Sequence, residues 1–319
     1  MKQTIKDLLN SEDGNLRKMG LTMAIFHNLK GVERDVLQLM DDRDSTVRSA
    51  ALEQLAKLKG SESSGPIARI AADEAEKPSN RYFAVKALIE MDAVDRIKGN
   101  IGSLLAQDSH SLKMEAMKAA LKTGEEGLYE DLLSVFYTGE FDLCEAAAKT
   151  IAGIKRCDGQ ELYELFVLLL EEEDEAQRYG AVVGLGEIAD PRSIPKIAPM
   201  LTHYIEKEDD RNAVRMLEAI ADTLGNIGTE RVLTQLIILL KSGSVGVRAK
   251  AAVALGRTGS KAAELSLKRA YELLENKSIK EHLARSMNAI RSGRPLDEPA
   301  PDCSIGEIEI DVSQFQDDD

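Results

Sequence analysis

The stretch that decides the fold is VRAKAAVALG, residues 247–256. Its basic residue, Arg248, is followed after three, four and seven positions by Ala251, Ala252 and Leu255. Spacings of three, four and seven place side chains on one face of an α-helix. The small residue three positions after the arginine lets a neighbouring helix come close. The stretch therefore predicts a helix that is packed along one side.

This pattern recurs along the chain with a period of 31 to 39 residues. A period in this range predicts an array of stacked repeats, in which each repeat is one small helical unit. We call the first residue of each copy its anchor, and the small or apolar residues that follow it fill the packed face. The nine anchors are Arg17, Arg48, Arg81, Lys113, Cys144, Arg178, Leu217, Arg248 and Leu283.

Each repeat reads as a helical hairpin, with an apolar first helix, a polar turn and the anchored second helix. Four residues before an anchor the turn often carries a side chain that can cap a helix N-terminus. These candidates are Asp13, Asp44, Ser109, Asp174 and Ser244. The sequence therefore predicts an all-α fold, an α-solenoid built as a superhelical stack of about nine hairpins over residues 1–293.

Three stretches, residues 44–52, 185–195 and 247–256, resemble HEAT repeats. They are most similar to the short form first associated with phycobilin-lyase subunits, which is common in bacterial and archaeal proteins. The resemblance implies a scaffold that binds other proteins. It also implies a ladder between turn aspartates and anchor arginines, which should be interrupted at Cys144 and Leu217.

Charge is spread unevenly along the chain. The formal net charge is −14, and nine acidic residues and no Lys or Arg stand in residues 295–319, which leaves −5 on the repeats. We expect an acidic flexible tail over residues 294–319, which could bind a partner, fold back on the repeats or only add solubility. The longest spacing between anchors contains residues 203–211, which we expect to form either an overlong helix that ends in a solvated loop or a projecting contact loop.

The sequence offers little for catalysis, and we expect neither an enzyme nor a bound cofactor. The four histidines are isolated and none is followed by Glu, unlike the His-Glu pairs that hold iron in deoxyhypusine hydroxylase, an enzyme family on this fold. Gly184 and Gly186 lie inside a predicted helix, so we interpret them as close-packing residues and not as a phosphate loop. The near-neutral repeats and the absence of Trp argue against nucleic-acid binding.

No stretch of 18 apolar residues is present, and Cys144, Cys157 and Cys303 lack metal-ligand spacing. We therefore expect a cytoplasmic protein that does not span a membrane, with its cysteines as packing or surface thiols.

The binding surface is expected on the second helices, which line the concave side in solenoids of this kind. Positions one and five after each anchor fall off the packed face and should be exposed. Three consecutive repeats carry lysine at position five, and we predict that they form a cationic ridge for an acidic segment of a partner protein. An ordinary solvated helix face is the alternative. The candidate partner-binding residues are Tyr82, Lys86, Met114, Lys118, Lys149 and Tyr179.

The function predicted from these features is a non-catalytic scaffold or adaptor for protein interactions. The alternative is an accessory subunit of an enzyme, such as a chromophore-handling complex of the bilin-lyase type. The oligomeric state and the identity of the partner remain open.

Overall fold

The computed structural model describes residues 1–27, 31–58, 63–154, 159–274, 276–293 and 296. All regular structure in these residues is helical, and the chain forms two compact units, Met1–Ile154 and Lys155–Asp319. The predicted acidic tail, residues 294–319, lies outside the described residues except for Leu296.

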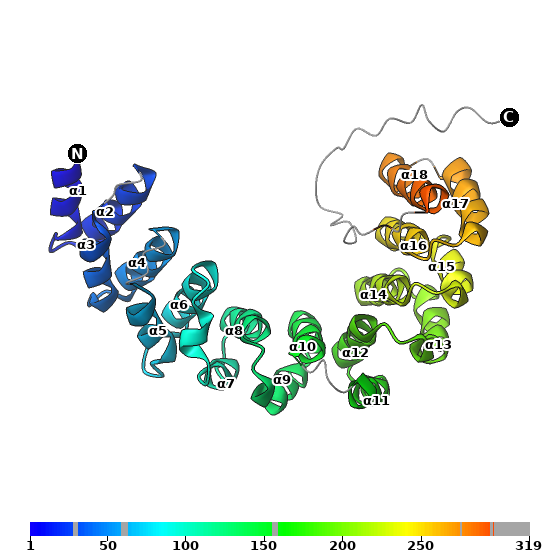
Figure 1. The fold of residues 1–319 in the computed structure, drawn as a ribbon, viewed down its shortest axis with the longest axis horizontal. Helices are drawn as coiled ribbons and strands as arrows, with labels where there is room; N and C mark the ends of the chain where they lie inside the picture. The colour runs from blue at the N-terminus through cyan, green and yellow to red at the C-terminus, as the bar shows by residue number, and fades with distance from the viewer. Residues whose placement is uncertain (28–30, 59–62, 155–158, 275, 294–295, 297–319) are drawn as a thin grey trace. The chain divides into compact units, whose positions relative to one another are not determined.

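Unit 1 is a stack of five helical hairpins. Within it the second helices follow one another in one layer and the first helices form the other (Figure 1). The hairpins are α1 (Lys2–Leu9) with α2 (Gly14–Phe26), α3 (Glu33–Gln38) with α4 (Ser45–Leu58), α5 (Ser64–Ala72) with α6 (Pro78–Glu90), α7 (Ile101–Leu105) with α8 (His110–Thr123), and α9 (Tyr129–Phe136) with α10 (Phe141–Ile154). Short 3₁₀ turns occupy Leu39–Asp41, Val94–Ile97 and Glu126–Leu128.

Unit 2 is built in the same way from four hairpins. They are α11 (Gly159–Leu169) with α12 (Glu175–Ile188), α13 (Ile194–Ile205) with α14 (Arg211–Ile227), α15 (Leu233–Leu239) with α16 (Val245–Arg257), and α17 (Lys261–Leu273) with α18 (Lys277–Ser292). Short 3₁₀ turns occupy Pro191–Ser193 and Glu230–Val232. The nine hairpins of the described residues confirm the predicted all-α fold class.

The predicted caps define where the second helices begin. The Asp13 carboxylate accepts a hydrogen bond from the Asn15 backbone N–H at 2.8 Å, and Asp174 accepts one from Gln177 at 2.9 Å. Ser109 also stands at the N-cap position of its helix, but its hydroxyl makes no capping hydrogen bond. Each side-chain cap satisfies a backbone N–H group that the helix itself leaves unpaired, which contributes about 0.5–2 kcal/mol.

The anchors donate hydrogen bonds to carbonyl oxygens that precede their own helix in the same hairpin. The Nη1 group of Arg178 donates to the carbonyl oxygens of Glu172 and Glu173, both at 2.7 Å. Cys144 takes the same role where the basic residue is missing, since its buried Sγ donates to the Phe136 carbonyl at 3.0 Å. The arginine anchor therefore satisfies carbonyl groups in the turn between the two helices, whereas Cys144 satisfies the carbonyl group of the last residue of α9.

The ladder between anchors and acids is shorter than the resemblance implies. Arg17 Nη2 donates to Asp42 at 2.8 Å, and Arg48 Nη2 donates to Glu76 at 2.7 Å. The third anchor, Arg81, is fully buried and donates instead to the Ala71 carbonyl at 2.9 Å. Along the described chain, the ion pairs between an anchor and an acidic residue thus end before Cys144. They end there because the third anchor, Arg81, donates its hydrogen bond within its own hairpin.

The longest spacing between anchors is taken up by one extra helical turn and a short connection. α14 begins six residues before its anchor, Leu217, whereas α12 begins three residues before Arg178. Between α13 and α14, Glu208 accepts a hydrogen bond from the Gly243 backbone N–H at 2.6 Å. The segment therefore packs on the turn of the next hairpin and does not project as a separate loop.

Candidate functional site

The predicted binding residues of unit 1 come together on consecutive second helices. Tyr82 and Lys86 lie on α6, Met114 and Lys118 on α8, and Lys149 on α10. The side chains of Tyr82, Lys86 and Met114 are half-buried, whereas Lys118 and Lys149 are exposed. These helices pack side by side, so the five side chains form a row across the second-helix layer of unit 1.

Tyr179 does not belong to an open surface, and the prediction that it is exposed is wrong. It lies on α12 in unit 2 and is 6% exposed. The guanidinium carbon of Arg215, on α14, lies 5.1 Å from the centre of its ring. An arginine at this distance covers the ring and interacts with its π-face. Tyr179 is therefore part of the packing between two helices of unit 2.

The lysine row carries less free positive charge than the sequence indicates. Lys118 Nζ lies 2.7 Å from Glu115 Oε1, and Lys149 Nζ lies 2.8 Å from Glu145 Oε1. Both ion pairs are formed within one helix, at spacings of three and four residues. Lys86 makes no ion pair with any residue that the structure describes. The expected ridge is thus one unpaired lysine followed by two lysines with local partners.

Apolar side chains lie beside the lysine row, and the sequence analysis missed them. Ile89 is half-buried and Leu121 is 45% exposed, each eight positions after its anchor. The rings of Tyr82 and Phe83 meet edge to face with centroids 5.1 Å apart. The recurrence of apolar residues at position eight was the signal that could have found them.

Unit 2 places a compact charged cluster on its second helices. Lys250 Nζ lies 2.7 Å from Asp222 Oδ2 and 3.9 Å from Glu218 Oε2. Burial raises the pKa of Glu218, and Asp222 raises it further, while Lys250 and Arg215 oppose the change. Because the opposite charges of the cluster pair with each other, we interpret it as a contact between α14 and α16 and not as a ligand site.

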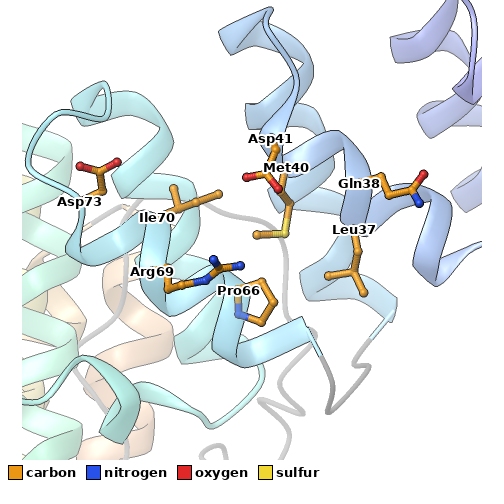
Figure 2. A pocket seen from close by; sticks show the side chains of 8 residues that line it. All are labelled: Leu37, Gln38, Met40, Asp41, Pro66, Arg69, Ile70 and Asp73. Carbon is orange, nitrogen blue, oxygen red and sulfur yellow. The ribbon is translucent and has the colours of Figure 1, made fainter.

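A groove of about 360 Å³ lies in the first-helix layer of unit 1, between the hairpins that contain α3 and α5. Figure 2 shows the guanidinium of Arg69 among Met40, Pro66 and Ile70, with Asp41 and Asp73 near one rim. The remaining lining residues are Leu37 and Gln38. Two carboxylates beside one guanidinium give the groove no single charge preference.

None of the described helices is long and apolar enough to cross a membrane. A group of three or more His, Cys, Asp or Glu residues that could hold a metal ion does not occur in the described ranges.

Residues 162–256 match the family model for HEAT repeats. This stretch covers most of unit 2, so HEAT repeats are present in that part of the chain. The phycobilin-lyase subtype has no such support. No curated protein matches the sequence.

Solved structures with the same arrangement of hairpins include two that match at a TM-score of 0.50 or above. The Escherichia coli protein YibA is 15% identical, with a TM-score of 0.50 and 91% of this chain and 92% of that chain covered. The karyopherin Kap121p, bound to the extreme C-terminus of the protein phosphatase Cdc14p, is 13% identical, with a TM-score of 0.51 and 90% and 41% covered. At this level of identity the similarity shows the fold alone.

Proposed function

We propose that the chain is a non-catalytic, cytoplasmic adaptor that binds a partner protein on the second-helix layer of unit 1. The observation that carries this proposal is the row of Tyr82, Lys86, Met114, Lys118 and Lys149 beside the exposed Leu121. Aromatic and methionine side chains are enriched in protein interfaces, and flanking lysines give such a surface charge selectivity.

An acidic segment of the partner can displace the local ion pairs at little cost. Exposed pairs within one helix contribute about 0.3–0.5 kcal/mol. Lys149 is 46% exposed and its partner Glu145 is 29% exposed, so this lysine can exchange partners. Lys118 differs because its partner Glu115 is only 9% exposed and would be left buried without a cation. Lys86 and Lys149 are therefore the lysines that we assign to the partner.

The test is a quantitative affinity capture from the native cell with a matched control. The variant Lys86→Glu with Lys149→Glu reverses the two assigned charges and leaves the Lys118 pair intact. The control, Lys196→Glu with Lys268→Glu, makes the same charge change at two exposed lysines on the first helices α13 and α17. We expect proteins whose recovery falls at least about tenfold with the first variant and stays unchanged with the control. Equal recovery with both variants would exclude this binding surface.

The alternative, an accessory subunit of the bilin-lyase type, rests on the resemblance to that short repeat. Coexpression with a bilin and an absorbance scan of the purified chain separates the two functions. A bound chromophore would favour the accessory subunit and count against a plain adaptor.

A further inference from the structure

The groove between the hairpins of α3 and α5 lies in the first-helix layer of unit 1, apart from the row of second-helix residues that we assign to a protein partner. Its volume of about 360 Å³ falls within the range of roughly 300–1,000 Å³ that is usual for pockets that hold one small molecule. We call this groove, whose lining residues are labelled in Figure 2, the Arg69 groove. Its size makes it a candidate site for a small ligand.

Apolar side chains from both hairpins line the groove. Met40 is buried, and Leu37, Pro66 and Ile70 are half-buried. A ligand that covers these side chains removes apolar surface from water, which favours binding. The thioether of Met40 also makes favourable contacts with aromatic rings. These residues therefore favour a ligand with a large apolar group, such as an aromatic ring.

Three charged groups of the groove make no ion pair with any residue that the structure describes. They are the guanidinium of Arg69 and the carboxylates of Asp41 and Asp73, and all three side chains are exposed. Asp73 uses one oxygen, Oδ1, to accept a hydrogen bond from the Ala75 backbone N–H at 3.0 Å. A ligand with groups of both signs can therefore pair with the guanidinium and with the carboxylates through charge-assisted hydrogen bonds.

We propose that the Arg69 groove binds a free α-amino acid with a large apolar side chain. Figure 2 shows the carboxylates of Asp41 and Asp73 near one rim and the guanidinium of Arg69 beside Pro66. An α-amino acid carries an ammonium, a carboxylate and its side chain on one carbon atom. Its ammonium would face the two aspartates, its carboxylate would pair with Arg69, and its side chain would cover the apolar residues of the groove.

Ligands with one charge or none fit the groove less well. An apolar amine would cover Arg69 without giving it an anion, and an apolar acid would leave Asp41 and Asp73 without a cation. A charged group that loses water without gaining a partner costs free energy. The backbone inside a peptide carries neither charge, so a peptide segment would need side chains of both signs. The free amino acid supplies both charges next to one apolar group.

Saturation-transfer NMR titration of the full chain with L-phenylalanine tests the proposal. We expect saturable binding with a Kd of about 1 mM, as for other ligands of this size. L-phenylalaninamide lacks the carboxylate and 3-phenylpropanoate lacks the ammonium, so each should bind at least about tenfold more weakly. No saturable binding up to about 20 mM L-phenylalanine would overturn the proposal. Equal affinity for N-acetyl-L-phenylalaninamide, which imitates the interior of a peptide, would also overturn it, since the groove would then be a docking surface for a protein segment.

Variants of the groove test which group pairs with which charge. Arg69→Gln should weaken L-phenylalanine binding at least about tenfold without weakening the amide, because the amide has no carboxylate for the guanidinium. Asp41→Asn with Asp73→Asn should weaken L-phenylalanine binding without weakening 3-phenylpropanoate. The control is Arg269→Gln, at an exposed arginine of the first helix α17, which should bind like the unmodified chain. Equal weakening of all ligands, or an equal effect of the control, would contradict the assignment. Circular dichroism melting confirms that each variant is folded.

Discussion

The two units differ at one position of the repeat, eight residues after the anchor. Three of the four second helices of unit 2 have glycine there, namely Gly186, Gly225 and Gly256, and α18 has Arg291. Unit 1 has no glycine at this position and carries Ile89 on α6 and Leu121 on α8. A Cβ atom on Gly225 would lie 2.8 Å from the Ala254 Cβ, and one on Gly186 would lie 2.7 Å from the Thr223 Oγ1. The glycines thus let the second helices of unit 2 meet at their backbones.

The residue at this position thus gives the second helices of the two units different surfaces. In unit 2 the close approach buries Tyr179 and lets Asn226 Nδ2 donate to the Gly186 carbonyl of the preceding helix at 3.3 Å. In unit 1 the bulkier residues stay at the surface, and Leu121 is 45% exposed. The second helices thus pack at closer range in unit 2, whereas unit 1 leaves a large apolar side chain exposed on this layer.

Charged groups of the two units also differ. Burial alone would raise the pKa of Glu76, but hydrogen bonds from Arg48, the Lys77 backbone N–H and Asn80 outweigh it and lower the pKa. Glu218 has no comparable set of donors, and burial raises its pKa. The surroundings of Glu76 thus favour its ionised form, whereas those of Glu218 disfavour it.

The largest expected effect comes from filling the close contact in unit 2. Gly225→Val would force α14 away from the Ala254 backbone, whose Cα lies 3.0 Å from the added Cβ, so we expect the free energy of unfolding to fall by about 3 kcal/mol. The matched change in unit 1, Ile89→Val, should cost less than about 1 kcal/mol. Urea denaturation followed by circular dichroism measures both. A cost below about 0.5 kcal/mol for Gly225→Val would show that the layer is not closed by backbone contact.

The second prediction concerns Glu76→Gln, which removes a carboxylate held by Arg48. We expect a loss of about 2 kcal/mol in the free energy of unfolding at pH 7. The pKa of Glu76 is lower in the folded chain than in the unfolded chain, so its contribution to the free energy of unfolding is fully present above the unfolded-state pKa. That contribution is lost as the pH falls through the folded-state pKa. The difference from the unmodified chain should therefore shrink in acid, as urea titrations at pH 7 and in acid would show.

Glu74→Gln is the control for this prediction, since Glu74 is exposed two residues away. It should change stability little at either pH. A constant cost of Glu76→Gln at both pH values would mean that its ionisation does not matter.

The smallest effect is expected for Glu218→Gln and has the opposite sign. The pKa of Glu218 is higher in the folded chain than in the unfolded chain, where it is about 4.3. Its favourable contribution to the free energy of unfolding is therefore present below the unfolded-state pKa and is lost as the pH rises through the folded-state pKa. The variant should be more stable than the unmodified chain by about 1 kcal/mol at pH 7, and this gain should vanish in acid. Destabilisation at pH 7 would show that attraction to Lys250 outweighs burial.

Most of the fold could be predicted from the sequence because its signals are local. The caps at Asp13 and Asp174 and the spacing of small residues after each anchor lie within a few positions of each other. The interpretation of Gly184 and Gly186 as close-packing residues is confirmed, since they lie against Phe166 and Thr223.

The site was predicted less well. The ion pairs of Lys118 and Lys149 could have been expected from their spacing to Glu115 and Glu145, because residues three or four apart on a helix are neighbours. The burial of Tyr179 could not, since Arg215 belongs to the next hairpin. Whether the five residues of unit 1 bind a partner stays a prediction.

The sequence by itself determined the repeat, the hairpins and the positions of the caps, because these depend on helix periodicity and on hydrogen bonds between near neighbours. Only the tertiary structure decided which side chains of the second helices are exposed and where Arg81 donates its hydrogen bonds. Those features depend on the distance between helices that are more than thirty residues apart, and the side chains of two repeats set that distance jointly.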